Sequence, residues 1–136
     1  MDIDYKAVFS GKVMARIFPA DRTDRFFDAL FGDPAEGAFD IRLEYDGNNG
    51  NQLSFTFKLR QRPGKCLVCN LTYGLPQVFE RHPVIDLGGI IKNIEKRMGG
   101  ELQCDRWELG STRELSREFH VIPLTLTLHK KHSKES

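Results

Sequence analysis

The stretch FDIRLEYDGNNGNQLSFTFKLR, residues 39–60, decides the fold of this chain. Apolar side chains occupy every second position on either side of a central run of Asp, Gly and Asn. Strict alternation is typical of a β-strand with one buried face, and Asn-Gly sequences are typical of tight hairpin turns. We therefore expect an antiparallel hairpin with one apolar face. Its inward residues are Phe39, Ile41, Leu43, Tyr45, Leu53, Phe55, Phe57 and Leu59.

The alternation continues after a second turn. Residues 62–65, Arg-Pro-Gly-Lys, place proline and glycine as a type II turn requires. A third strand is expected to run through Leu67, Cys69, Leu71 and Tyr73. Residues 39–75 then form a three-stranded antiparallel meander, with one face packed on a covering layer and the other open to water or a partner.

Two amphipathic helices are expected to cover the apolar face. Residues 21–31 begin with good capping residues and end at Gly32, a natural C-cap. Residues 84–98 carry apolar side chains at helical spacing, although Gly88 and Gly89 weaken the middle of this helix. Asp86 is an alternative N-cap, which would leave residues 83–85 as an extended lead-in.

Three further strands complete the predicted sheet. Residues 4–18 alternate well enough to predict a first strand, with a bulge or bend at Gly11. Residues 102–109 and 113–128 are expected to form the last two strands, joined by residues 110–112. The apolar parity changes within 121–123, which predicts a bulge or break there.

These elements predict one α+β domain over residues 1–128, in the order β-α-β-β-β-α-β-β. Its two layers are a curved antiparallel sheet and two helices packed on one face. Residues 129–136 are expected to be a flexible polar tail. The run of helix, three strands, helix and two strands over residues 21–128 resembles the order in small bacterial secretion chaperones. The resemblance rests on order alone, and no site residue follows from it.

Composition indicates a soluble globular protein. The chain has 136 residues, 40% of them apolar and 29% charged, with a formal net charge of +1. The absence of a basic excess disfavours nucleic acid as a partner. No apolar run is long enough to cross a membrane, the first residues do not resemble a secretion signal, and an odd count of three cysteines favours free thiols. We expect a cytoplasmic location and no membrane association.

Motifs for metal or catalytic chemistry are weak. The one C-x-x-C sequence, Cys66 to Cys69, lies on an expected strand, where residues three apart point to opposite faces. The run of Asp, Gly and Asn over residues 46–51 lacks the glycine and glutamate of a calcium loop. His120 shares its parity with Glu114 and Glu118, which we interpret as a polar stripe on the open sheet face. We therefore predict no catalytic residues, no metal site and no cofactor.

A basic stripe is the most notable surface feature. It consists of outward-facing residues on two neighbouring strands, and cross-strand ion pairs with Asp40, Glu44 and Asp46 explain the same pattern. If the stripe is functional, it is the predicted partner-binding surface. Its members are Arg42, Lys58, Arg60 and Arg62.

The favoured hypothesis is a non-catalytic protein-interaction or adaptor module, expected to form a homodimer or to bind a protein partner by its open sheet face or an edge strand. The alternative is a small-ligand-binding or enzymatic domain with a pocket between helix and sheet. Nucleic-acid binding through residues 58–65 is a weaker alternative. The predicted pocket residues of the second hypothesis are Tyr45, Tyr73, Trp107 and His120.

Overall fold

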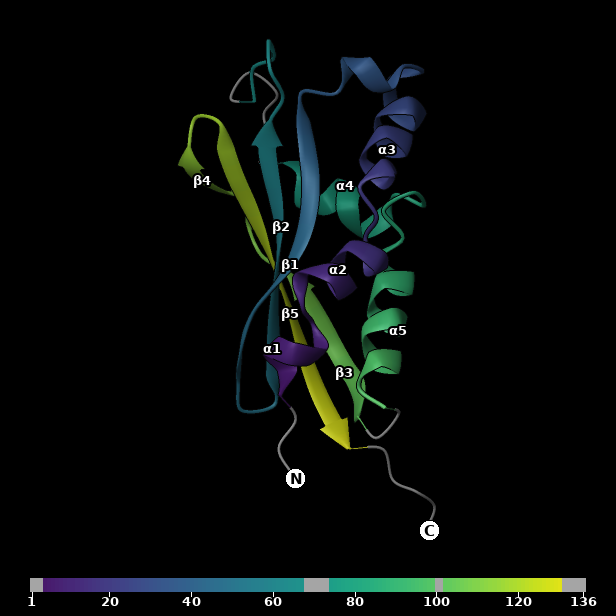
Figure 1. Cartoon of the computed structure of the whole chain (residues 1–136), viewed down its shortest axis with the longest axis vertical. Helices are drawn as coiled ribbons and strands as arrows, with labels where there is room; N and C mark the ends of the chain where they lie inside the picture. Colours follow the sequence, from purple (N-terminus) through teal and green to yellow (C-terminus); the bar gives the residue numbers. More distant parts are fainter. Residues whose placement is uncertain (1–3, 68–73, 100–101, 131–136) are drawn as a thin grey trace.

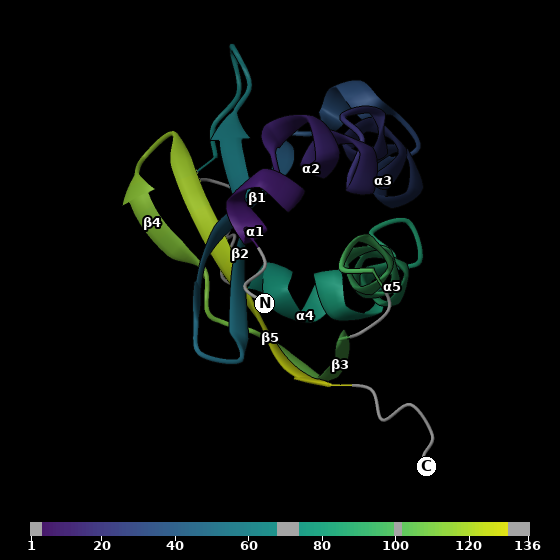
Figure 2. The same ribbon diagram turned by 60° about the horizontal axis from the view of Figure 1, so that its bottom comes forward.

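The computed structural model describes residues 4–67, 74–99 and 102–130. Their fold is α+β, with an antiparallel sheet and helices gathered on one side of it (Figures 1 and 2), which confirms the predicted class. The strands are β1 (Phe39–Asn49), β2 (Gln52–Gln61), β3 (Leu102–Leu109), β4 (Arg113–Ser116) and β5 (Phe119–Lys130). The helices are α1 (Tyr5–Val8), α2 (Gly11–Ile17), α3 (Asp21–Phe31), the 3₁₀ turn η1 (Pro34–Glu36), α4 (Leu75–Arg81) and α5 (Leu87–Arg97).

The hairpin predicted from residues 39–60 is confirmed. β1 and β2 pair from Phe39 opposite Gln61 to Asn49 opposite Gln52. A bulge after Tyr45 interrupts the register, and Gly50 in the turn has a φ of +61°, a conformation that glycine adopts without steric cost.

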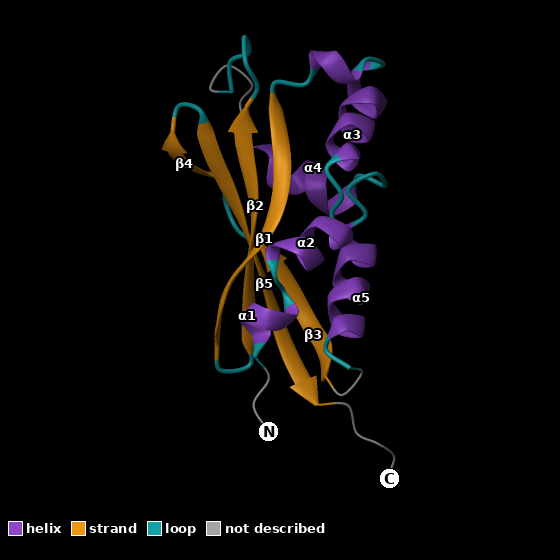
Figure 3. Ribbon diagram, in the orientation of Figure 1, coloured by secondary structure: helices purple, strands orange, loops and turns teal. Residues whose placement is uncertain are grey.

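The predicted meander is wrong, because β2 has β5 as its second neighbour. The sheet order is β1-β2-β5-β3, with β4 also paired to β5 (Figure 3). β5 pairs with β2 from Phe119 opposite Arg60 to Thr127 opposite Gln52. Both edges of β2 are therefore occupied, one by β1 and the other by β5. Leu67 is buried, and residues 68–73 lie outside the described part of the chain.

The N-terminal strand predicted over residues 4–18 is wrong, because this segment forms α1 and α2. The segment carries a helical pattern as well as an alternating one, and the buried residues Met14, Ile17 and Phe18 follow the helical pattern. Ser10 caps α2 by accepting a hydrogen bond from the Val13 backbone N–H at 3.4 Å. Gly11 begins this helix and marks no bulge.

Both predicted helices are present, and α4 was missed in addition to α1 and α2. α3 spans residues 21–31 as predicted, and the alternative start of the second helix is confirmed, since Asp86 is the N-cap of α5. A Cβ on Gly89 would collide with the capping carboxylate of Asp86, which explains a glycine inside the first turn. The missed helix, α4, buries Phe79 against the ring of Phe57 at a centroid distance of 5.2 Å.

The C-terminal third is one long hairpin. β3 and β4 follow one another along the same edge of β5, and the chain reverses between Ser116 and Phe119 instead of at residues 110–112. The predicted bulge at residues 121–123 is wrong, since the β2–β5 register is regular there. β5 also continues to Lys130, so the predicted tail begins inside the strand.

The core lies between the helices and the inward face of the sheet. Its centre is β2, whose inward residues Phe55, Phe57 and Leu59 have no exposed surface. The rings of Phe9, Phe18 and Phe79 pack edge-on against the two β2 phenylalanines, at centroid distances of 5.2–5.8 Å. Edge-to-face packing of this kind adds to the free energy gained from burial alone.

We predict that Gly37→Ala destabilises the protein. A Cβ at this position would overlap the buried ring of Phe27, and overpacking of a filled core typically costs about 1–3 kcal/mol. Gly88→Ala in α5 is the matched control, because its Cβ would meet no atom within 4 Å. The free energy of unfolding of this control should rise by about 0.5–1 kcal/mol, because alanine has a higher helix propensity than glycine. Urea unfolding measures both, and equal stabilities of the two variants would contradict the packing argument.

Candidate functional site

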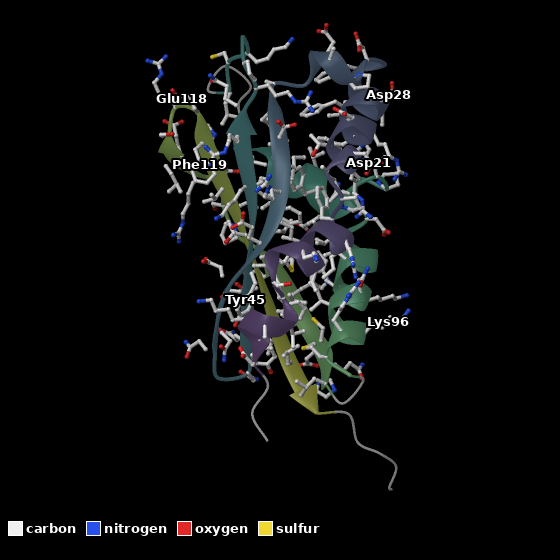
Figure 4. All side chains as sticks on the ribbon, in the orientation of Figure 1. Asp21, Asp28, Tyr45, Lys96, Glu118 and Phe119 are labelled. Carbon is white, nitrogen blue, oxygen red and sulfur yellow. The ribbon has the colours of Figure 1, made fainter. Side chains whose placement is uncertain are left out.

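The predicted pocket residues do not come together. Trp107 lies opposite Leu126 in the β3–β5 pair, six positions along β5 from His120, which corresponds to about 20 Å. Tyr45 lies on β1, at the other edge of the sheet, and Figure 4 shows it well below Phe119, the neighbour of His120. Tyr73 lies outside the described residues. The described members of this set share no pocket.

Tyr45 and His120 each have a structural environment of their own. The Tyr45 ring packs between Phe9 and Phe55, and burial, reinforced by nearby Tyr5 and Asp4, raises the pKa of its phenol. His120 was predicted on the open face, which is wrong: its side chain is buried beside the core. The even-numbered residues of β5 face inward, so His120 has the same orientation as Ile122.

His120 joins β4 to β5. Its Nε2 lies 3.4 Å from Oε2 of Glu114, the residue directly opposite it in the β4–β5 pair. The two residues were expected to share one face of a single strand, whereas they lie opposite each other on two paired strands, with His120 buried and Glu114 exposed.

Two of the four stripe residues are engaged in ion pairs within the fold. Arg62 binds Asp24 at 2.8 Å and Asp40 at 3.0 Å, and it also donates a hydrogen bond to the Pro34 carbonyl at 2.9 Å. Lys58 Nζ lies 2.6 Å from Glu44 Oε1. Cross-strand ion pairing thus accounts for Lys58 and Arg62, and it also neutralises Asp40 and Glu44.

Arg42 and Arg60 are the stripe residues left without a carboxylate. Within the described part of the chain neither guanidinium lies in an ion pair, and both side chains are exposed. The guanidinium of Arg60 lies over the ring of Phe119, 4.7 Å from its centroid. The outer face near β1 therefore has two positive charges that the fold itself does not neutralise.

β1 is an edge strand whose free side is closed at one residue by Thr23. The buried Thr23 hydroxyl accepts a hydrogen bond from the Ile41 N–H at 3.1 Å and donates one to the Ile41 carbonyl at 3.3 Å. Thr23 thereby takes the place that a neighbouring strand would occupy beside Ile41. Edge strands of natural proteins are commonly protected against unwanted pairing by devices of this kind.

The backbone of Leu43 points to the same free side. Outward and inward backbone groups alternate along an antiparallel edge strand, so Leu43, two residues beyond Ile41, directs its N–H and C=O away from β2. In the part of the chain that the structure describes, no hydrogen bond reaches these groups from outside the β1–β2 pair. Leu43 is only 1% exposed, however, so these backbone groups are covered and an added strand cannot reach them.

Two adjoining hollows follow this edge, and together we call them the edge cleft. The apolar hollow, about 350 Å³, lies between α2 and β1 and is lined by Gly11, Met14, Ala15, Phe18, Ala20, Ile41, Arg42, Leu43 and Glu44. The charged hollow, about 390 Å³, opens toward the outer sheet face and is lined by Ala20, Thr23, Asp40, Ile41, Arg42, Glu44, Lys58 and Arg60. Three of the four predicted stripe residues therefore line the cleft.

Sequence reasoning missed the α2–α3 side of this cleft. Ala15 had been assigned to a strand, and nothing local distinguishes Ala15 or Ala20 from other small exposed residues. Thr23 was identified only as a residue at the start of a helix. The hydrogen bonds of its hydroxyl to Ile41, 18 positions away, exist because α3 packs beside β1.

The cysteines differ from the expectation of free thiols. Cys66 is in a disulfide bond, and Cys69 lies outside the described residues. Cys104 is a free thiol on β3 that donates a hydrogen bond to the Arg106 carbonyl at 3.1 Å. Burial, together with the nearby carboxylate of Glu95, raises its pKa to about 11.

The described residues hold no cluster of three or more His, Cys, Asp and Glu side chains suited to a metal ion. None of the described helices has the length and apolar character needed to cross a membrane. No protein-family model, curated protein or solved structure matches this chain.

We predict that Thr23→Val opens the backbone of Ile41. Valine keeps the shape of threonine but removes both hydrogen bonds, so the free energy of unfolding should fall by about 1–3 kcal/mol. The Ile41 amide should also exchange its hydrogen faster. Thr23→Ser is the matched control, because it retains the hydroxyl. Equal protection of the Ile41 amide in the two variants would contradict this role.

A second prediction concerns the thiol of Cys104. Because only the thiolate reacts, a pKa of about 11 predicts very slow alkylation by iodoacetamide at pH 8, with a rate that rises about tenfold per pH unit below the pKa. Peptide mapping of alkylated Cys104 measures this rate. Glu95→Gln removes a charge that raises the pKa, so it should speed the reaction at pH 8. A wild-type rate equal to that of the urea-unfolded chain would refute the prediction.

Proposed function

We propose that this protein is a non-catalytic interaction module that binds a short extended segment of a partner protein in the edge cleft. The observation that carries the proposal is the combination, in one cleft, of an apolar hollow between α2 and β1 and a charged hollow lined by the exposed Arg42 and Arg60, which have no carboxylate partner in the described chain. An apolar pocket beside unpaired charges suits a peptide, because burial of a side chain gives affinity and charge complementarity gives specificity.

The two hollows fit neighbouring side chains of an extended segment, because successive side chains of such a segment point in opposite directions. One side chain would enter the apolar hollow between α2 and β1, and the next would lie beside Arg42 in the charged hollow. The backbone of Leu43, which is 1% exposed, takes no part, so burial of the apolar side chain is expected to supply much of the affinity.

The edge cleft favours a short segment over a second copy of this chain. A long strand laid along β1 would collide with Thr23 where that side chain occupies the edge at Ile41. The homodimer expected from the sequence is therefore not part of this proposal. The small-ligand hypothesis has less support because its described residues are dispersed, and the nucleic-acid hypothesis because Lys58 and Arg62 are ion-paired.

The test uses two display libraries of random heptapeptides, one fused to its carrier by the N-terminus and one by the C-terminus. Enriched peptides from either library should shift the NMR signal of the Leu43 amide and bind in a fluorescence anisotropy titration. Failure of both libraries to yield a binder, or binders that leave the β1 signals unchanged, would overturn the proposal.

We predict that Ala15→Phe weakens binding of such a peptide at least tenfold. Ala15 is exposed and lines the apolar hollow, so a phenyl ring there should occupy the space of the peptide side chain. Ala29→Phe is the matched control, an identical substitution at an exposed position of α3 that does not line the cleft. It should bind like the wild type. Equal affinities of the two variants would place the peptide elsewhere.

A further inference from the structure

The free edge of β3 is exposed, whereas that of β1 is covered. β3 lies at the opposite end of the strand order from β1. Residues 105–108 of β3 are all exposed, and among them is the large side chain of Trp107, at 38%. An exposed edge strand with an apolar side chain is prone to pair with a strand of another chain. The β3 edge is therefore the side of this sheet that is open to pairing.

The backbone of Trp107 faces this free edge. The Gly110 N–H donates a hydrogen bond to the Pro123 carbonyl of β5 at 2.8 Å, and backbone groups alternate in direction along an antiparallel strand. Glu108 therefore also bonds toward β5, and Trp107 directs its N–H and C=O away from β5. In the part of the chain that the structure describes, no hydrogen bond reaches these two groups of Trp107 from outside the β3–β5 pair.

The open stretch of this edge is short and has Trp107 at its centre. On one side of the stretch, the carboxylate of Glu95 in α5 accepts a hydrogen bond from the Cys104 N–H at 2.6 Å and covers the edge there. On the other side, β3 ends at Leu109. The open stretch thus extends over residues 105–109, which are arranged symmetrically about Trp107. A second copy of the same stretch, turned antiparallel, matches it in length.

The charges on either side of Trp107 are self-complementary. Arg106 and Glu108 are two positions apart, and their β5 partners are outward-facing threonines, so both side chains point to the outer face of the sheet. Within the described residues neither of them lies in an ion pair. When two β3 strands pair antiparallel about Trp107, Arg106 of each copy lies opposite Glu108 of the other. A twofold axis at Arg106 or at Glu108 would instead place like charges opposite each other, which is destabilising.

We infer that β3 joins two copies of this chain into a symmetric dimer. The two strands pair antiparallel about a twofold axis at Trp107, whose N–H and C=O exchange two hydrogen bonds with those of the other copy. Arg106 and Glu108 form two ion pairs across the axis. The two indole rings meet on the helix side of the sheet, because Trp107 lies opposite the buried Leu126. The inference is independent of the proposed function, since β1 lies at the opposite edge and both edge clefts of the dimer stay open.

Sedimentation velocity and fluorescence test for this dimer together. The dimer fraction should rise with protein concentration. The emission of Trp107, the one tryptophan of the chain, should move to shorter wavelength in parallel, because its ring loses contact with water. A monomer at every concentration would overturn the inference. A dimer that forms without a change in the Trp107 emission would also overturn it, because the interface would then lie elsewhere.

Charge reversal tests the register of the two strands. Arg106→Glu and Glu108→Arg each place two pairs of like charges across the axis, so each should weaken self-association at least about tenfold. Arg117→Glu and Glu118→Arg are the matched controls, which make the same reversals at exposed positions in the turn between β4 and β5. The controls should dimerise like the wild type. Equal dimerisation of all four variants would contradict pairing about Trp107.

A mixture of the two edge variants separates charge repulsion from misfolding. A chain with Arg106→Glu and a chain with Glu108→Arg place opposite charges at both contacts across the axis. An equimolar mixture should therefore recover a dimer, with the accompanying shift of the Trp107 emission, although each variant alone remains monomeric at the same concentration. Failure of the mixture to form this heterodimer would overturn the inference.

Discussion

The inward face of β2 is the constraint on which the rest of the structure depends. Phe55, Phe57 and Leu59 have no exposed surface, and burial of each such side chain contributes about 1.5–3 kcal/mol. The hairpin alone leaves this face in water, so α2 and α4 must supply Phe18 and Phe79 to cover it. β5 occupies the second edge of β2 and makes it a central strand.

Two polar side chains then determine where α3 lies. Thr23 bonds the free edge of β1, and Arg62 ties the end of β2 to Asp24 in α3 and to the Pro34 carbonyl in η1. These contacts hold α3 beside the sheet edge, with the linker at Ala20 forming one wall of the edge cleft. The same contacts that protect β1 at Ile41 also shape the edge cleft, so edge protection and the proposed binding site have one structural origin.

Long, strongly periodic segments of this chain were predictable, and short ones were not. The hairpin and α3 follow their patterns because each buries one face over many residues. β3 also spans the predicted residues 102–109, although none of its residues is buried. Residues 4–18 carry two competing periods, and a segment of that length does not decide between them. The wrong prediction of the second neighbour of β2 has another cause. The turn sequence after β2 favours pairing with the segment that follows it in the chain. In the fold β5 pairs with β2 instead, because β5 offers a long apolar face.

The sequence by itself determined which residues alternate, which face of each strand is apolar, and that Arg42, Lys58, Arg60 and Arg62 lie together on the outer side. Only the tertiary structure decided which of these charges are neutralised, because the partners of Arg62 come from α3 and η1 as well as from the neighbouring strand. It also decided that Thr23 closes the β1 edge at Ile41. Hydrogen bonds between groups 18 positions apart depend on packing, and no local pattern encodes them.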